Sequence, residues 1–400
     1  MHDEQIKGLA SDVFERVVGW RRAIHEKPEA PFEEHMTAKM AADLMRGLGF
    51  EVKTGIAGTG VVGLLRGASS GPTVALRADM DSLPVFEDTG RPWCSKVNGR
   101  MHACGHDGHT AMLMGAAWVL SMMKDKLKGD VKFIFQPSEE KDGGAEPMIE
   151  AGIMEDPHVD AIFATHIWPD VRLGSVKVHH GPAMASLDAF DAKLYGRGGH
   201  VATPHKSLDA ITAAGQFLMQ LQTIVSREID PTEPVVVSVG TINGGTAYNA
   251  IAHEVAMTGT VRAVNPSLRE ILRNKIEMKL KGVAEATSTE YAYNYHFGYP
   301  PVVNSTEMAE FVHATAGRIL GKDSSGYAER PSLVGEDFAY FAKKAPGAIY
   351  LLGVGDDSIS KYPLHHPKFD FDERALETGV RLHAQLAVDY LAGRSADGSI

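Results

Sequence analysis

The stretch MHACGHDGHT, residues 101–110, places one cysteine, three histidines and an aspartate within ten positions. Thiolate and imidazole groups are the ligands that zinc-like metal ions prefer. Cys104 and His106 have one residue between them, a spacing that suits a loop better than a helix. We therefore expect Cys104, His106 and His109 to cluster where a loop enters a long apolar helix that begins near residue 107.

Three kinds of site fit this cluster. A structural zinc site is normally rich in cysteine, and the chain has only two, Cys94 and Cys104. Cys104 could instead be a thiol nucleophile with a histidine as its base. A catalytic metal site needs further ligands from elsewhere, oxygen donors among them, and it is favoured because such candidates exist.

The further candidates follow segments that read as strands. Glu139 and Glu140 end FQPSEE, His166 follows the apolar run in FATHIWP, and His365 and His366 lie in the late loop YPLHHPKFDFDE. Neighbouring side chains on an extended backbone point in opposite directions, so one glutamate can bind metal while the other accepts a proton. Each signal is weak alone, since paired glutamates are often an exposed acidic loop. Their joint occurrence in one layer points to a metal site.

Strands and helices alternate over the first part of the chain, which predicts an α/β layer with a mixed, mostly parallel sheet. We expect helices over 4–47, interrupted between residues 28 and 31, and β-structure over 51–80. Ligands gather at the carboxyl ends of the strands in such sheets. The glycines of GTGVVG, residues 58–63, have the spacing of a dinucleotide-binding fingerprint, but a strand and a tight turn follow them, which argues against nucleotide binding.

A different pattern begins near residue 186. The segment LDAFDAKLYGRGG alternates as a half-buried strand, and a helix over 208–228, two strands, a helix over 266–285 and the strand EYAYNYHF follow it. The order β-α-β-β-α-β is that of a ferredoxin-like sandwich. We expect an α/β domain formed by 1–185 and 301–400, interrupted by an inserted domain over 186–300.

Composition narrows the range of partners. The 400 residues carry a net charge of −11, which argues against nucleic acid and anionic membrane partners. Two cysteines make no disulfide framework and suit a reducing compartment. The N-terminal residues lack the signal-peptide pattern, and the apolar run over 111–123 is too short to span a bilayer. We expect a cytoplasmic protein.

Seven segments together resemble one family, in order from about residue 20 to 380. They are RRAIHEKPEAPFEEHMTA, RADMDSLP, MHACGHDGHTAMLMGAA, FQPSEE, GRGGHVATPH, GTVRAVNP and LHHPKFDFDE. The chain resembles the hippurate hydrolase branch of the dinuclear-metal aminoacylase/carboxypeptidase family. The resemblance implies cleavage of N-acyl amino acids at the amide bond by a metal-bound hydroxide, with a dipeptidase or a xenobiotic amide hydrolase as the alternative. A non-enzymatic metal-binding protein is a third possibility. The presence of Glu139, which could act as a base, argues against it.

The resemblance also implies roles for single residues. Two divalent ions, most simply zinc, with manganese, cobalt or nickel as alternatives, would share Cys104 as a bridging thiolate. Glu139 would be the general acid/base. The implied metal ligands are Cys104, His106, Glu140, His166 and His365.

Three further residues lie in the inserted domain. His200 would reach the site of a neighbouring subunit in a homodimer or a dimer-based tetramer. Asn249 and Arg262 would hold the substrate, Arg262 through its carboxylate. The inserted domain would therefore serve as lid and dimerisation domain.

The chain departs from the family pattern at several positions. The pair HH leaves His365 and His366 as alternative ligands. The loop after the paired glutamates is usually glycine-rich in the family, and here it begins with KDGG. VGEDF stands at 334–338, where serine commonly precedes the Glu-Asp pair. Arg77 occupies the place of a metal-binding histidine in other branches, so Asp79 is not included among the expected site residues.

Overall fold

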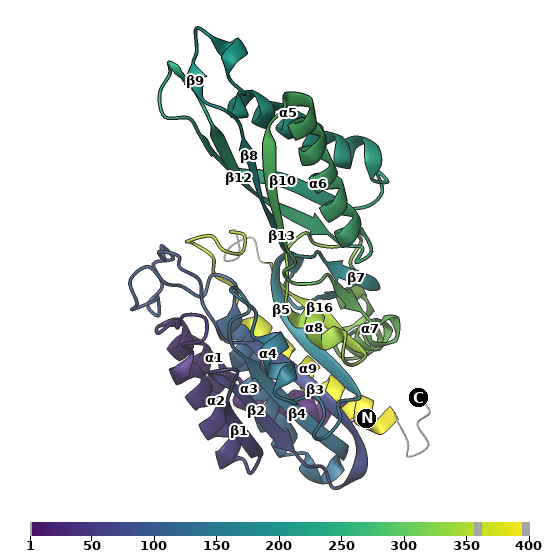
Figure 1. Cartoon of the computed structure of the whole chain (residues 1–400). Helices are drawn as coiled ribbons and strands as arrows, with labels where there is room; N and C mark the ends of the chain where they lie inside the picture. The colour runs from purple at the N-terminus through teal and green to yellow at the C-terminus, as the bar shows by residue number, and fades with distance from the viewer. Residues whose placement is uncertain (1, 356–361, 394–400) are drawn as a thin grey trace. The chain divides into compact units, whose positions relative to one another are not determined.

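The computed structural model describes residues 2–355 and 362–393 and divides the chain into two compact units (Figure 1). The first unit contains Met1–Gly181, Val303–Arg330 and Asp337–Ile400, and the second contains Pro182–Val302 and Pro331–Glu336. The sequence placed 331–336 in the α/β domain, but these residues pack with the second unit. Residue 1 and residues 394–400, at the ends of the predicted α/β segments, lie outside the described residues.

A mixed eight-stranded sheet forms the centre of the first unit. Its central strands β4, β3, β5 and β16 run parallel to one another, while β1 and β2 are antiparallel at one side. Strand β16 is buried on both faces, as the continuous apolar run GAIYLLGVG predicts. In spatial order the strands are β1 (Glu51–Ile56), β2 (Gly60–Leu65), β4 (Lys128–Gln136), β3 (Ser69–Asp79), β5 (Ala161–Arg172), β16 (Gly347–Gly355), β6 (Val176–Val178) and β15 (Ser325–Tyr327).

Five helices share one hydrophobic core with this sheet. Helix α3 is buried on nearly every side and packs against α1 and α9, which accounts for the nearly continuous run of apolar residues that follows its first turn. Two short helices, α4 (Ala145–Glu150) and α8 (Phe338–Ala342), pack together, and α8 also contacts β5 and β16. The five core helices are α1 (Asp3–His25), α2 (His35–Gly47), α3 (His106–Ser121), α7 (Thr306–Leu320) and α9 (Arg374–Gly393). No helix in the described part of the chain is long and apolar enough to cross a membrane.

The second unit is built around an antiparallel sheet in the spatial order β10-β12-β8-β13. Its inward residues on β8, Phe190, Ala192 and Leu194, pack in a core with two helices. A separate pair of short strands joins β9 (Gly199–His200) to β11 (Ala250–Ile251). Along the chain the elements are β8 (Asp188–Tyr195), α5 (Ala210–Thr223), β10 (Val235–Gly244), β12 (Glu254–Ala263), α6 (Leu268–Thr287) and β13 (Glu290–His296).

Two local predictions differ from the structure. His166 lies inside β5 rather than past the end of a strand, because β16 pairs with β5 as far as Arg172. The helix expected over 208–228 ends as an α-helix at Thr223 and continues as a π-helical turn over Ile224–Glu228.

Candidate metal centre

The predicted ligands converge on one edge of the central sheet. Because β4, β3 and β5 are neighbouring parallel strands, their carboxyl ends meet at the same edge. Glu139 and Glu140 follow β4, and His166 lies on β5. Cys104 and His106 lie at the start of α3, where Gly105 has a φ of 86°, a left-handed conformation that glycine adopts without strain.

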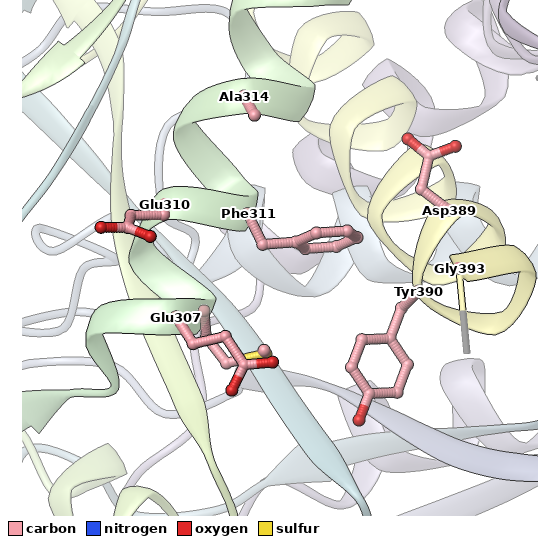
Figure 2. A pocket seen from close by; sticks show the side chains of 8 residues that line it. Glu307, Glu310, Phe311, Ala314, Asp389, Tyr390 and Gly393 are labelled. Atoms are coloured by element: carbon pink, nitrogen blue, oxygen red, sulfur yellow. The ribbon is translucent and has the colours of Figure 1, made fainter. Parts of the chain in front are cut away.

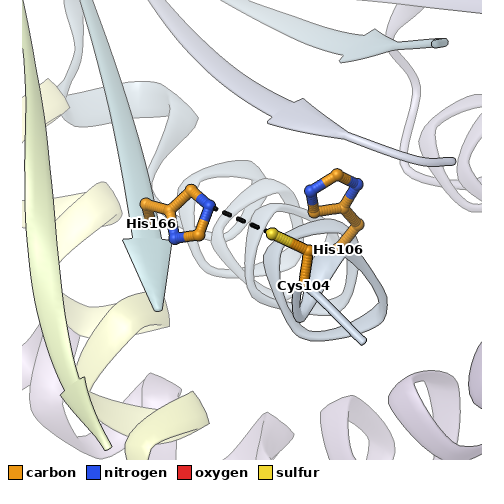
Figure 3. A group of neighbouring side chains, drawn as sticks. All are labelled: Cys104, His106 and His166. Atoms are coloured by element: carbon orange, nitrogen blue, oxygen red, sulfur yellow. Dashed lines mark hydrogen bonds between the residues drawn. The ribbon is translucent and has the colours of Figure 1, made fainter. Parts of the chain in front are cut away.

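Two groups of possible ligands overlap at Cys104, and Figure 3 shows the first of them, Cys104 with His106 and His166. The ligand atoms of Cys104, His106 and His166 all lie within 4.8 Å of one another, and so do those of Cys104, Glu140 and His365. The Cys104 Sγ atom is 3.6 Å from His166 Nε2. The arrangement can therefore offer three donors to each of two ions, with one sulfur atom common to both sets.

The hydrogen bonds of the two histidines leave the correct nitrogen available for a metal ion. His106 Nδ1 lies 2.9 Å from the Asp81 carbonyl oxygen, and its buried Nε2 has no hydrogen-bond partner in residues 2–355 and 362–393. His166 Nδ1 donates to the Ile167 carbonyl oxygen at 2.7 Å, which leaves the Nε2 lone pair directed at Cys104. Metal-bound histidines usually donate their other ring N–H in this way, so both residues fit a metal site.

Burial and negative charge dominate the electrostatics of the cluster. Burial alone would lower the pKa of His106, but Asp79, Asp81 and Glu140 together raise it to about 10. Burial, reinforced by Glu140 and Glu139, raises the pKa of the Cys104 thiol well above its usual value. Burial lowers the pKa of His166 to about 3. Carboxylates in excess beside a buried thiol and a neutral imidazole make an environment that a divalent cation would balance.

Asp81 contacts three of the predicted site residues, although it was not among them. Its Oδ1 atom accepts the Glu139 backbone N–H at 3.0 Å and lies 3.2 Å from His106 Nδ1, while Oδ2 accepts the Glu140 backbone N–H at 3.0 Å. The side chain is buried. The acidic motif RADMD was a signal, but the three partners of Asp81 lie 25, 58 and 59 residues away in the sequence.

The loop before the paired glutamates is held from the N-terminal region. Ser138 has a φ of 53°, and its backbone N–H donates to the buried Glu34 carboxylate at 2.9 Å. Thr59 donates to the same carboxylate. Glu139 is buried beside Glu140, and both lie within reach of His106.

The geometry separates the two neighbouring histidines of the late loop. His365 Nε2 lies 3.2 Å from Glu140 Oε1, and the His365 backbone N–H donates to the Ala103 carbonyl oxygen. His365 has a φ of 67°, which is unusual for a residue with a side chain and often marks a functional position. The His366 ring instead stacks on Tyr362, with ring centroids 4.5 Å apart. The structure thus brings His365, and not His366, to the cluster.

His109 lies in the cluster, but both of its ring nitrogens have partners. Its Nδ1 is 2.7 Å from Asp79 Oδ1, and its Nε2 accepts the Ile167 backbone N–H at 2.9 Å. His109 therefore has no free nitrogen for a metal ion. Asp79, omitted from the expected site, is fully buried and forms a close group with His106 and His109.

The other expected site residues belong to the second unit. His200 is exposed on β9, opposite Ala250 of β11, and this pairing brings it near Asn249 in the local structure. Arg262 lies half-buried on β12, where it donates to the Thr260 hydroxyl, and burial lowers its pKa. Their proposed roles toward substrate stay predictions.

A cavity of about 340 Å³ lies elsewhere in the first unit, between α7 and α9 (Figure 2). Apolar side chains such as Phe311 and Tyr390 line it, together with acidic side chains at Glu307, Glu310 and Asp389. Its described lining includes neither cysteine nor histidine, so this cavity does not offer the mixed donor set found at the sheet edge.

Comparison with known proteins identifies the family. Residues 75–389 match the model of peptidase family M20/M25/M40. An N-acyl-L-amino acid amidohydrolase of Geobacillus stearothermophilus is 41% identical over 77% of this chain and 83% of its own length. Thermostable carboxypeptidase 1 of Saccharolobus solfataricus is 40% identical over 97% of this chain and 98% of its own.

A solved structure agrees with these relatives. A dinuclear metal-binding peptidase of the M20 family from Bacillus subtilis is 34% identical, with a TM-score of 0.84, over 96% of this chain and 99% of that chain. The predicted family resemblance and the mixed, mostly parallel α/β sheet are therefore confirmed. The chain belongs to peptidase family M20/M25/M40 and is a metal-dependent amidohydrolase.

Proposed function

We propose that this enzyme hydrolyses the amide bond of N-acyl amino acids, such as N-acetyl or N-benzoyl derivatives, to a carboxylic acid and a free amino acid. The observation that carries the proposal is the pair of ligand groups sharing Cys104, with Glu139 beside them. The similarity to an N-acyl-L-amino acid amidohydrolase supports the substrate class. The free cysteines, one of them in the ligand cluster, favour a reducing, cytoplasmic location.

Two divalent ions would be held by two sets of residues that meet at the Cys104 thiolate. One set adds His106 and His166, and the other adds Glu140 and His365. Sulfur and imidazole donors favour zinc, and the carboxylate leaves manganese, cobalt and nickel as alternatives. When bound, the ions supply Lewis acidity, which lowers the pKa of a water molecule and polarises the amide carbonyl.

The chain's own residues would move the proton and bind the substrate. Glu139, whose backbone N–H is held by Asp81, takes a proton from the attacking water and delivers it to the leaving amine. His200 from the lid of a neighbouring subunit donates to the oxygen on which negative charge develops. Asn249 and Arg262 hold the amino-acid half, with the Arg262 guanidinium on its carboxylate.

A dipeptide, or another peptide with a free carboxyl-terminal carboxylate, is the second candidate substrate. The similarity to a carboxypeptidase favours it, because both substrate classes present a free carboxylate next to the scissile amide. A hydrolysis panel of N-acyl amino acids, dipeptides and their carboxyl-amidated analogues separates the two. If Arg262 binds the substrate carboxylate, Arg262→Ala raises KM for substrates with a free carboxylate and leaves KM for the carboxyl-amidated analogues nearly unchanged.

The decisive variant is Glu139→Gln. We expect it to keep the wild-type metal content, measured by elemental analysis, and to lower kcat by about 10²–10⁴-fold, because only the proton acceptor is lost. Glu150→Gln, at an exposed glutamate on α4, is the matched control and should behave as wild type. Loss of metal from Glu139→Gln would instead mean that Glu139 is the ligand and Glu140 the base.

A further inference from the structure

Arg77 lies buried at the centre of the sheet edge that carries the ligand cluster. On β3 it stands opposite Ile134 of β4 on one side and Ala164 of β5 on the other. Its guanidinium donates Nη1 to Asp79 at 2.8 Å, Nε to Gln136 at 2.7 Å and Nη2 to Asp337 at 2.9 Å. The rigid planar fork of arginine thus fixes three acceptors at once, which a lysine ammonium on a flexible stem does less well.

One set of hydrogen bonds connects Arg77 to β5, the strand that carries His166. Asp79 binds Arg77 through Oδ2 and His109 Nδ1 through Oδ1, the latter at 2.7 Å. The Ile167 backbone N–H can only donate, so the His109 Nε2 that accepts it carries a lone pair and the ring proton is on Nδ1. The Ile167 carbonyl oxygen in turn accepts the N–H of His166 Nδ1 at 2.7 Å. The chain of contacts ends at the ring whose Nε2 faces Cys104.

A second set of hydrogen bonds connects Arg77 to the end of β4, which the paired glutamates follow. Gln136 is the last residue of β4, three positions before Glu139, and its Nε2 donates to the Asp337 carboxylate at 2.7 and 2.8 Å. Asp337 Oδ2 also accepts the Ala145 backbone N–H at the start of α4. The loop that bears Glu139 and Glu140 therefore begins and ends at groups that Arg77 holds directly or through one carboxylate.

We infer that Arg77, Asp79 and His109 form a positioning relay that fixes His166 relative to Glu140, and so sets the spacing of the two ligand groups. The inference rests on the proposed dinuclear function. None of the three is assigned to a metal ion or to substrate. His109 is a ligand in neither set, since both of its nitrogens are engaged, and the Arg77 charge is matched by the buried carboxylates of Asp79 and Asp337.

The test is a titration of chelator-treated protein with Co²⁺, following the thiolate-to-cobalt absorption that Cys104 should give, with bound cobalt counted by elemental analysis. We expect wild type to bind two Co²⁺. His109→Leu should weaken one of the two by about 10–100-fold and change the absorption band, as loss of an outer partner of a ligand does. His109→Gln should restore binding, because its amide can donate to Asp79 and accept from Ile167.

His179→Leu is the matched control. His179 is another buried histidine of the first unit, whose Nε2 lies 2.9 Å from the Arg330 carbonyl oxygen, and its loss should leave Co²⁺ binding unchanged. Arg77→Lys tests the contribution of Arg77 separately, since lysine keeps the positive charge but cannot make the same three hydrogen bonds. We expect weaker binding of the second Co²⁺ in this variant, measured on protein that circular dichroism in chelator shows to be folded.

The outcomes separate the two proposals. If wild type binds fewer than two Co²⁺, the dinuclear function itself fails, whatever the variants do. If wild type binds two and the folded His109→Leu and Arg77→Lys proteins bind both with wild-type affinity and spectrum, the relay is wrong and the function stands. Should His109→Leu fail to fold, normal Co²⁺ binding by Arg77→Lys is sufficient to overturn the relay.

Discussion

Asp81 connects the paired glutamates to His106. Its two carboxylate oxygens accept the backbone N–H groups of Glu139 and Glu140, and Oδ1 also lies beside His106 Nδ1. An ionised carboxylate is an acceptor at both oxygens, whereas an amide replaces one acceptor with a donor. The position of the loop therefore depends on both side-chain oxygens of Asp81 being acceptors.

Asp81→Asn should accordingly place an NH₂ group against an N–H group in a buried site. We expect a fall in metal affinity or in kcat of about 10–100-fold, measured by metal titration and steady-state kinetics. Asp125→Asn, at an exposed aspartate in the short 3-10 helix Lys124–Lys126, controls for the loss of one negative charge. Wild-type values for both quantities in Asp81→Asn would show that the glutamate loop is held by other contacts.

The sequence predicted the types of residue in the cluster better than their connections. The ligand candidates Cys104, His106, Glu140 and His166 could be named because each is a good metal donor beside an apolar run of the sequence, and because the family resemblance implied the same residues. The sequence could not show which of His365 and His366 joins the cluster, because this depends on the positive φ of His365 and on its contact with Glu140. Asp81 and the engaged state of His109 likewise depend on partners that only the folded sheet brings close.

His25 gives the first unit a specific dependence on pH. It is the last residue of α1 and is buried, with Nδ1 2.8 Å from Asp107 of α3 and Nε2 3.3 Å from Glu87. Burial alone would lower its pKa, but the two carboxylates raise it to about 9. Because the folded value exceeds the unfolded one, protonated His25 stabilises the fold fully below the unfolded pKa, and this contribution is lost as the pH rises through about 9.

We therefore expect the free energy of unfolding to fall by up to about 3 kcal/mol between about pH 6 and pH 9.5 through His25. His25→Asn should be less stable than wild type at the lower pH and should lose much less stability over the same interval. Chemical denaturation at several pH values measures this difference. His158→Asn, at an exposed histidine, should keep the wild-type slope. Parallel slopes for wild type and His25→Asn would rule out this contribution.

At the scale of elements, the boundaries that the sequence predicted well are those with an unambiguous local signal. The run GAIYLLGVG is bounded on both sides and forms β16 over Gly347–Gly355. The end of β5 could not be found in the same way, because its extension depends on pairing with β16. Helix α7, Thr306–Leu320, was not predicted, although Ser305 caps it and its buried residues recur at helical spacing.

Helix α3 depends on glycine for close packing in its first turn. A Cβ atom at Gly108 would lie 2.7 Å from the Phe371 ring and 2.8 Å from the Ile167 side chain. Gly8, in contrast, is exposed on α1, and a Cβ atom there would have no atom within 4 Å. The same substitution should therefore have opposite effects in the two helices.

Gly8→Ala should stabilise the protein by about 0.5–1 kcal/mol, because alanine loses less backbone entropy in a helix. Gly108→Ala should destabilise it by about 1–3 kcal/mol through overpacking. It should also disturb metal binding, since Ile167 is the neighbour of His166. Thermal and chemical denaturation of both variants, with metal titration of the second, measures these effects. A stabilised Gly108→Ala protein would mean that the surrounding core yields without cost.

At the scale of the whole molecule, the two units have separate hydrophobic cores. The second unit contains an antiparallel sheet with the chain order β-α-β-β-α-β, and it carries His200, Asn249 and Arg262 on a part of the chain distinct from all the ligands. If the proposed roles of His200, Asn249 and Arg262 hold, the residues that bind substrate and the residues that hold metal belong to different hydrophobic cores.

If the lid acts on a neighbouring subunit, two inactive chains should complement each other. His200→Ala and Glu139→Gln, expressed together with different affinity tags and purified through both, should give a mixed dimer with one intact site and about half of the wild-type activity. Each variant alone should be nearly inactive. Failure to purify a mixed species would contradict the dimer. A mixed dimer without activity would place His200 in the site of its own subunit, because then each chain would lack one of the two groups that a single site needs.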